Sequence, residues 1–425
     1  MGIKVAVIGG GSTYTPELIE GLANRRDRLP IDELVLEDLD PDRLSVVGGL
    51  AERMLRRLEW TGRLSLISDP VEAIEGASFV LVQLRVGGQV ARLSDETLPL
   101  QFGTIGQETT GAGGLAKALR TVPVVLELAD LADRHAAAGA WLIDFTNPVG
   151  IVTQALIDTG HHAIGLCNVA ISLQRSIARR IGVDPDSLEL GQTGLNHLSW
   201  ITAIRADGRD LLPEILDTHG ESIARELGLP VSHVRDLGAV PSYYLRYYDA
   251  FDDVMAEQLG GHHRAEEVMD LEDRLLAMYA DPALDTKPEL LNDRGGAWYS
   301  EAAARLLASL HDGRGDVQVV DVRNGDAMPD LAADDVVEVP ARIDRDGAHP
   351  IRQAPMPPAM RDLVRSIKAF ERLAIRAAMS GERGDVRAAL EAHPLVGGRI
   401  GDVEPLLDAL LAANRQHLPR FGATR

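Results

Sequence analysis

The fold is decided by the stretch Ile3-Lys4-Val5-Ala6-Val7-Ile8-Gly9-Gly10-Gly11-Ser12. Its first six residues are almost continuously apolar, which predicts a strand that is covered on both faces of a sheet. Three glycines follow at once, and residues 13–22 are typical of a helix start. This strand, glycine turn and helix form the context in which dinucleotides bind, because glycines let the backbone approach a pyrophosphate. We expect the cofactor-binding residues here to be Gly9, Gly10, Gly11, Ser12 and Thr13.

The end of the second predicted strand supports this interpretation. Residues 33–36 are followed by Glu37 and Asp38, an acidic pair suited to ribose hydroxyls. Carboxylates there favour NAD over NADP, because they repel a 2′-phosphate. The glycine fingerprint is imperfect, since Tyr14 stands at its last glycine position. A tight turn followed by a solvated acidic loop is the alternative interpretation.

Further strands are expected at about 64–67, 79–83, 141–145 and 162–166, with helices between them and the longest at about 114–138. This alternation predicts an α/β fold with a Rossmann-like, doubly wound sheet of the lactate/malate dehydrogenase kind. The second half predicts an α+β C-terminal domain. We therefore expect an NAD-binding domain at 1–170 and a substrate, metal and oligomerisation domain at 171–425.

Residues 85–114 look like a long loop-rich segment that carries several charged side chains. Long ordered loops in compact domains are usually functional. Arg85 and Arg92 could hold a phosphate through paired N–H groups. A surface loop with solvated charges is the alternative.

The composition restricts the class of partner. The 425 residues include 43 Lys and Arg against 64 Asp and Glu, which gives a net charge of −21. Nucleic acids and anionic membranes need a basic face, so we expect neither as a partner. An anionic substrate would need a local arginine cluster. The single cysteine precludes an intrachain disulfide, and we find no apolar stretch of membrane-spanning length, so we expect a cytoplasmic protein.

That cysteine, Cys167, follows the strand predicted at 162–166, at the edge where ligands bind in open α/β sheets. His197 comes later, in the segment Gly194-Leu195-Asn196-His197-Leu198. A thiolate and an imidazole can share one divalent metal. A buried apolar cysteine and an unrelated histidine are the alternative. His262 and His263 form a rival pair, which we expect to be structural because adjacent side chains diverge.

Taken together, several motifs resemble glycoside hydrolase family 4, the NAD- and metal-dependent glycosidases, along nearly the whole chain. The motifs are the glycine turn, Arg85-Val86-Gly87-Gly88, Gly106-Gln107-Glu108-Thr109, Thr146-Asn147-Pro148, Gly165-Leu166-Cys167-Asn168, Gly194-Leu195-Asn196-His197, Tyr243-Tyr244-Leu245-Arg246-Tyr247-Tyr248 and His393-Pro394-Leu395-Val396. The Cys-Asn pair resembles the 6-phospho-β-glucosidase branch, since α-acting relatives have a proton-donating Asp in place of Asn168. Ala170 departs from the family pattern, in which a proline is usual.

The resemblance implies an unusual hydrolysis. NAD+ accepts a hydride from C3 of the sugar, a base removes the C2 proton, the aglycone leaves, water adds, and the hydride returns. It implies that Tyr244 is the base, that Glu108 raises its basicity, and that Cys167 and His197 hold the metal, expected to be Mn2+. We also expect Asn168 in the catalytic site, and substrate contacts from Arg92, Asn147 and Arg264, to which we add Arg85 as a phosphate ligand.

The expected substrate is a phosphorylated disaccharide or aryl β-glucoside, and the resemblance implies a homodimer or homotetramer. Three alternatives remain open from the sequence. The chain could act on unphosphorylated or α-linked sugars by the same route. It could be an NAD-dependent hydroxy-acid dehydrogenase, or it could bind NAD as a sensor without turnover.

Overall fold

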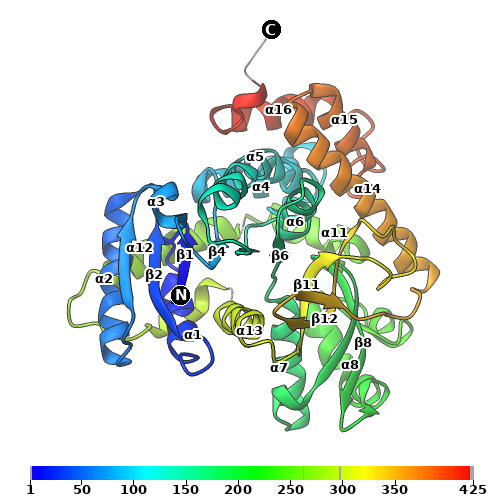
Figure 1. Ribbon diagram of the computed structural model, residues 1–425. Coiled ribbons are helices and arrows are strands. Elements are labelled where there is room, and N and C mark those ends of the chain that lie inside the picture. The colour runs from blue at the N-terminus through cyan, green and yellow to red at the C-terminus, as the bar shows by residue number, and fades with distance from the viewer. Residues whose placement is uncertain (1, 262, 296–297, 422–425) are drawn as a thin grey trace.

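The computed structural model describes residues 2–261, 263–295 and 298–421, and its core is one long mixed sheet (Figure 1). The strand order is β13-β12-β11-β6-β5-β4-β1-β2-β3, and the six strands from β6 to β3 are parallel. The strands of this sheet are β1 (Ile3–Ile8), β2 (Ile31–Glu37), β3 (Arg63–Ile67), β4 (Phe79–Val82), β5 (Trp141–Asp144), β6 (Ala163–Gly165), β11 (Asp316–Arg323), β12 (Val336–Asp344) and β13 (Gly347–Pro350).

Strand β1 lies between β2 and β4, and alternate side chains of it enter two different cores. Val5 and Val7 belong to one hydrophobic cluster, whereas Ala6 and Ile8 belong to another on the opposite face. Both faces of the strand are therefore buried, as the continuous apolar run predicts. The Rossmann-like sheet predicted from residues 3–12 is confirmed.

Helices cover both faces of the sheet (Figure 1). The first face is covered by α1 (Thr15–Ala23), α2 (Pro41–Arg57), α12 (Arg264–Tyr279) and α13 (Tyr299–Asp312). The second face is covered by α3 (Pro70–Ile74), α5 (Gly111–His135), α6 (Val149–Asp158), α14 (Pro358–Ser380), α15 (Arg383–Ala392) and α16 (Glu404–Asn414). Because the last three helices pack on α5, the two ends of the chain share one core.

The segment predicted as loop-rich is largely helical, so that prediction was wrong. It contains α4 (Gly88–Thr97) and a 3-10 turn at Pro99–Phe102. The buried residues of α4 include Gln89, Asp95 and Glu96 beside Ala91. Polar residues on the buried face remove the apolar repeat by which an amphipathic helix is recognised.

A smaller sheet lies beside the long one in the C-terminal half. It consists of β7 (Glu189–Leu195), β8 (Leu198–Ala206), β9 (Arg209–Asp210) and β10 (Val240–Pro241). Around it lie α7 (Val169–Ile181), α8 (Leu212–Leu227) and α9 (Val231–Arg235). The next helices, α10 (Arg246–Asp249) and α11 (Phe251–Leu259), pack in a separate small cluster with Ile105 and Leu395. The division at residue 170 stays a prediction, and the long sheet draws strands from both sides of it. Within the described ranges, no helix combines the length and apolarity that crossing a bilayer requires.

Candidate active site

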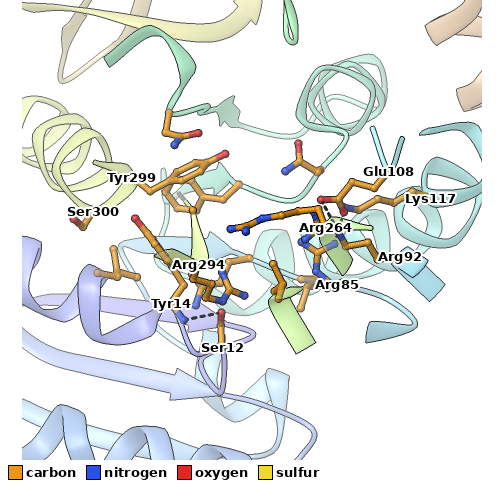
Figure 2. Close-up of a pocket in the computed structure, with 18 of the residues that line it drawn as sticks. Ser12, Tyr14, Arg85, Arg92, Glu108, Lys117, Arg264, Arg294, Tyr299 and Ser300 are labelled. Atoms are coloured by element: carbon orange, nitrogen blue, oxygen red, sulfur yellow. Dashed lines mark hydrogen bonds and ion pairs between the residues drawn. The ribbon is translucent and has the colours of Figure 1, made fainter. Parts of the chain in front are cut away.

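A cavity of about 350 Å³, here called the central cavity, lies beyond the carboxyl ends of β1, β4, β5 and β6. It brings together all of the predicted catalytic and substrate-binding residues and one of the two predicted metal ligands (Figure 2). Those that line it are Arg85, Arg92, Glu108, Asn147, Asn168, His197, Tyr244 and Arg264. The sequence did not point to four further lining residues, namely Tyr14, Lys117, Arg294 and Tyr299.

A second cavity of about 480 Å³, the turn cavity, lies against the glycine turn. Gly9, Ser12, Glu37 and Asp38 line it, as predicted for a cofactor site. Gly9 has a φ of +85°, and a Cβ there would lie 2.7 Å from the carbonyl oxygen of Gln83, so only glycine fits. This close turn and the neighbouring carboxylates fit a dinucleotide.

The remaining predicted cofactor residues, Gly10, Gly11 and Thr13, belong to the glycine turn but do not line the turn cavity. The Gly10 N–H donates to the Glu37 carbonyl at 2.6 Å, and the Gly11 N–H donates to Asp38 Oδ2 at 2.9 Å. Thr13 is fully buried. Burial, together with the nearby charge of Asp38, raises the pKa of Glu37 to about 7. Cofactor contacts from all seven predicted residues stay a prediction.

The turn cavity and the central cavity are adjacent, because some of the same residues line both. The shared residues are Ser12, Gln83, Leu84, Arg85 and Arg294. A molecule in the central cavity would therefore lie next to one that occupies the turn cavity.

One side of the central cavity, here called the charged wall, consists of Arg85, Arg92, Glu108 and Lys117 (Figure 2). Glu108 accepts from Lys117 Nζ at 2.5 Å and from the Arg85 guanidinium, and Arg92 Nε lies 3.3 Å from its Oε1. Burial alone would raise the pKa of Glu108, but these three cations hold that pKa well below its usual range.

Lys117 lies on α5, a helix whose buried segment is otherwise mostly apolar. Its side chain is 3% exposed. Burial, followed by repulsion from Arg85, lowers the pKa of Lys117 to about 7. The sequence signal that could have revealed Lys117 is a single lysine between apolar positions of a predicted helix, because a buried ammonium group needs a buried partner.

A second part of the lining, here called the neutral wall, consists of Asn168, His197, Tyr244 and Tyr299. His197 has a φ of +64° in the two-residue turn between β7 and β8, a conformation that L-residues rarely adopt. Its Nδ1 lies 3.0 Å from Thr109 Oγ1, and its ring stacks on Tyr244 with centroids 3.8 Å apart. Burial lowers the pKa of His197 to about 3, which keeps the imidazole neutral. A neutral ring oriented through one nitrogen suits metal ligation by the other.

Cys167 lies immediately behind the neutral wall. Its Sγ is 4.0 Å from the Tyr299 hydroxyl, and burial raises the pKa of the thiol to about 12. The thiol lines a different cavity of about 420 Å³ on its other side. Binding a cation would stabilise the thiolate, so a soft thiolate and a neutral imidazole fit a divalent transition metal. In the described parts of the chain, no three His, Cys, Asp or Glu side chains group as a metal site.

The same surroundings disfavour ionisation of Tyr244 when no cation is present. Burial, followed by the charges of Cys167 and Glu108, raises the pKa of Tyr244 well above its usual range. A divalent ion on the adjacent His197 would oppose this effect.

Comparison with known proteins identifies the family. Residues 4–183 match the profile described as Family 4 glycosyl hydrolase, and residues 192–396 match that of the Family 4 glycosyl hydrolase C-terminal domain. The chain belongs to glycosyl hydrolase family 4. The predicted family is thus confirmed.

Relatives of this family 4 chain match over almost its full length. It is 37% identical to a probable 6-phospho-β-glucosidase of Bacillus subtilis over 99% of this chain and 98% of that protein. A 6-phospho-β-glucosidase of Thermotoga maritima, solved with manganese, NAD+ and glucose 6-phosphate, has a TM-score of 0.91 at 32% identity, covering 98% of this chain and 99% of that one. Malate dehydrogenase of Plasmodium falciparum shares the fold, with a TM-score of 0.53 at 13% identity, over 89% of this chain and 98% of that one.

The remaining predicted residues of this family 4 chain lie as follows. Asn147 Oδ1 is buried without a hydrogen-bond partner, as expected for an atom that awaits a ligand. Arg264 begins α12 and donates to Glu267 and to the Asp293 carbonyl. His263 precedes α12 and does not line the central cavity, whereas His262 lies outside the described residues.

Proposed function

We propose that this family 4 chain hydrolyses 6-phospho-β-glucosides, disaccharide or aryl, with NAD+ and a divalent cation, Mn2+, as cofactors. The observation that carries the proposal is that the two cavities are adjacent and share Ser12, Arg85 and Arg294 in their lining. Substrate and dinucleotide can thus lie in contact. The names and bound ligands of the relatives support the same substrate class.

The charge of the central cavity supports an anionic substrate. Among the described lining residues, five are cationic, against one carboxylate, Glu108. The cations are Arg85, Arg92, Lys117, Arg264 and Arg294. This local excess opposes the net charge of −21, so it would attract a phosphorylated sugar that the rest of the surface repels.

The neutral wall supplies the groups for proton removal. We assign the removal of the C2 proton to the Tyr244 oxygen, with Glu108 nearby as the charge that raises its basicity. Cys167 and His197 would hold the cation, which as a Lewis acid would polarise oxygens on the sugar and lower the pKa of Tyr244. NAD+ in the turn cavity would supply reversible hydride transfer at C3. Asn168 and Asn147 would orient the sugar by hydrogen bonds.

The test is release of nitrophenol from nitrophenyl β-glucoside 6-phosphate with Mn2+ and reductant, with and without NAD+. We expect release that requires both cofactors and the phosphate, without net NADH. Release from the unphosphorylated or α-linked analogue would replace the substrate proposed here. Accumulation of NADH with a hydroxy acid and no glycoside cleavage would favour a dehydrogenase of the malate dehydrogenase kind. A homodimer or homotetramer and a cytoplasmic location stay predictions.

A further inference from the structure

When a sugar aglycone leaves, its oxygen needs a proton that a group in the central cavity must donate. The leaving oxygen is strongly basic, so cleavage is slow unless an acid protonates it. Asn168, at the carboxyl end of β6, is an amide and has no acidic proton to give. Another group must supply this proton.

Most of the other residues that line the central cavity are unsuited to donate this proton. A guanidinium does not release its proton in proteins, which excludes the arginines. His197 is assigned to the metal site, which occupies the ring nitrogen that faces the cavity, and Glu108 is ionised among its three cations, so neither carries a proton to donate. A tyrosine hydroxyl is a weak acid with an ordinary pKa of about 10, and burial raises the pKa of Tyr14 further, so Tyr14 and Tyr299 are poor proton donors. Among the described lining residues, Lys117 is the remaining candidate.

The position of Lys117 suits the role. Its Nζ is buried in the charged wall and donates to Glu108 Oε2, which fixes the ammonium within the cavity (Figure 2). Glu108 also acts electrostatically on Tyr244, so acid and base share one neighbouring carboxylate. An acid is most effective when its pKa lies near the working pH, and that of Lys117 is lowered to about 7.

We propose that Lys117 is the general acid that protonates the leaving aglycone oxygen, an inference that rests on the proposed function. As the C1–oxygen bond breaks, its electron pair goes to the aglycone oxygen, which takes a proton from Nζ. The aglycone departs as an alcohol and Lys117 is left neutral. When water adds to C1, its proton passes to Nζ, and Tyr244 returns the proton to C2, so both residues regain their starting states.

The test compares leaving groups in Lys117→Met and Lys117→Arg, each with NAD+ and Mn2+. Arginine keeps the charge beside Glu108 but cannot give up a proton. We expect both variants to lose roughly 100-fold or more in turnover of a glucose disaccharide 6-phosphate. With 2,4-dinitrophenyl β-glucoside 6-phosphate, whose aglycone leaves without protonation, we expect turnover within about fivefold of the wild type.

A second measurement separates acid catalysis from positioning. Exchange of the C2 hydrogen of glucose 6-phosphate in D2O needs Tyr244 but no leaving group, so we expect it to survive in both variants. The matched control is Lys368→Met, which removes a buried lysine bonded to Glu371 outside the central cavity. We expect Lys368→Met to change turnover of the two substrates by the same factor.

Three results for the Lys117 variants would overturn the assignment. They are an equal loss of turnover on the disaccharide and the dinitrophenyl substrate, a loss of C2 hydrogen exchange without any difference between the two substrates, and unchanged turnover of the disaccharide. If Lys117→Met does not fold, the assignment is decided by Lys117→Arg alone, from its turnover of the two substrates and its C2 exchange, each relative to the wild type. A wild-type protein that cleaves neither phosphoglucoside but is folded would instead remove the proposed function, and the acid role with it.

Discussion

The two walls of the central cavity carry their polar groups in opposite states. The charged wall pairs Glu108 with Arg85, Arg92 and Lys117 within ion-pair distance, so burial there is compensated by mutual attraction. On the neutral wall and behind it, burial keeps His197 and the Cys167 thiol uncharged. The charges of the charged wall are therefore balanced by side chains of the protein itself, whereas the groups of the neutral wall would ionise only when a cation binds.

This difference explains why each wall needs the other. A tyrosine on the neutral wall cannot lose its proton without a nearby positive charge. The charged wall supplies fixed cations that attract an anionic sugar but is held in place by its own pairs. Substitutions on the two walls should consequently fail in different ways, in stability on one side and in cofactor-dependent chemistry on the other.

The largest effect is expected from Tyr244→Phe. Removal of a positioned base should lower turnover of the nitrophenyl phosphoglucoside by about 1,000-fold. NAD+ affinity should stay within about twofold, since Tyr244 does not line the turn cavity. Steady-state kinetics and NAD+ titration would measure both. Tyr248→Phe is the control, because Tyr248 packs near His393 outside the central cavity. Turnover above a tenth of the wild type would remove the base assignment.

Glu108→Gln should break the charged wall. The change leaves three buried cations without their shared carboxylate and should lower the free energy of unfolding by about 3 kcal/mol at pH 7. Because the folded-state pKa of Glu108 is depressed, its stabilisation is present above the unfolded pKa of about 4.5 and is lost as pH falls towards the folded value. Urea unfolding at pH 7 and pH 4 should show the gap between variant and wild type narrowing.

A matched exposed pair provides the control for this effect. Glu52 bonds Arg56 on the surface of α2, and Glu52→Gln should cost less than about 0.5 kcal/mol at either pH. Equal costs for the two substitutions would mean that burial of the charged wall does not set its energetics.

Cys167→Ser should change the neutral wall without a large loss of stability. Replacing a soft thiolate with an alcohol should weaken Mn2+ affinity by roughly tenfold or more, measured by calorimetric titration. Thr109→Val, which removes the partner of His197 Nδ1, should weaken it less. Full activity of Cys167→Ser in a chelator would contradict the metal site.

Which parts of the two walls could be predicted follows from local pattern. The strand and glycine turn at residues 3–12 are contiguous, so the sequence predicts the Rossmann-like sheet correctly, whereas the cofactor site at the turn stays a prediction. Cys167 and His197 were predicted as metal ligands from their chemistry and the family resemblance, since no spacing rule joins them, and this assignment stays a prediction.

The parts that were missed depend on contacts between distant segments. Helix α4 was missed because its buried polar side chains meet partners far along the chain, such as Glu272 for Gln89. Lys117 was missed for a different reason, because it carries no motif even though its partner Glu108 lies only nine residues earlier in the chain. The antiparallel addition of β11 to β6, through Asp321 and Gly165, joins residues that no local periodicity relates.

The smallest effect is expected in the turn cavity, at Asp38. Its carboxylate accepts from the Gly11 N–H at 2.9 Å, and it would repel the 2′-phosphate of NADP+. Asp38→Asn should weaken NAD+ binding by about fivefold, or roughly 1 kcal/mol, and bring the dissociation constants of NAD+ and NADP+ closer together. Asp40→Asn tests whether this reflects cofactor recognition, because Asp40 caps α2 through Oδ1 and lies outside the turn cavity. If Asp40→Asn shifts the cofactor ratio as much as Asp38→Asn does, the preference arises from the loop's overall charge and not from the carboxylate at the glycine turn.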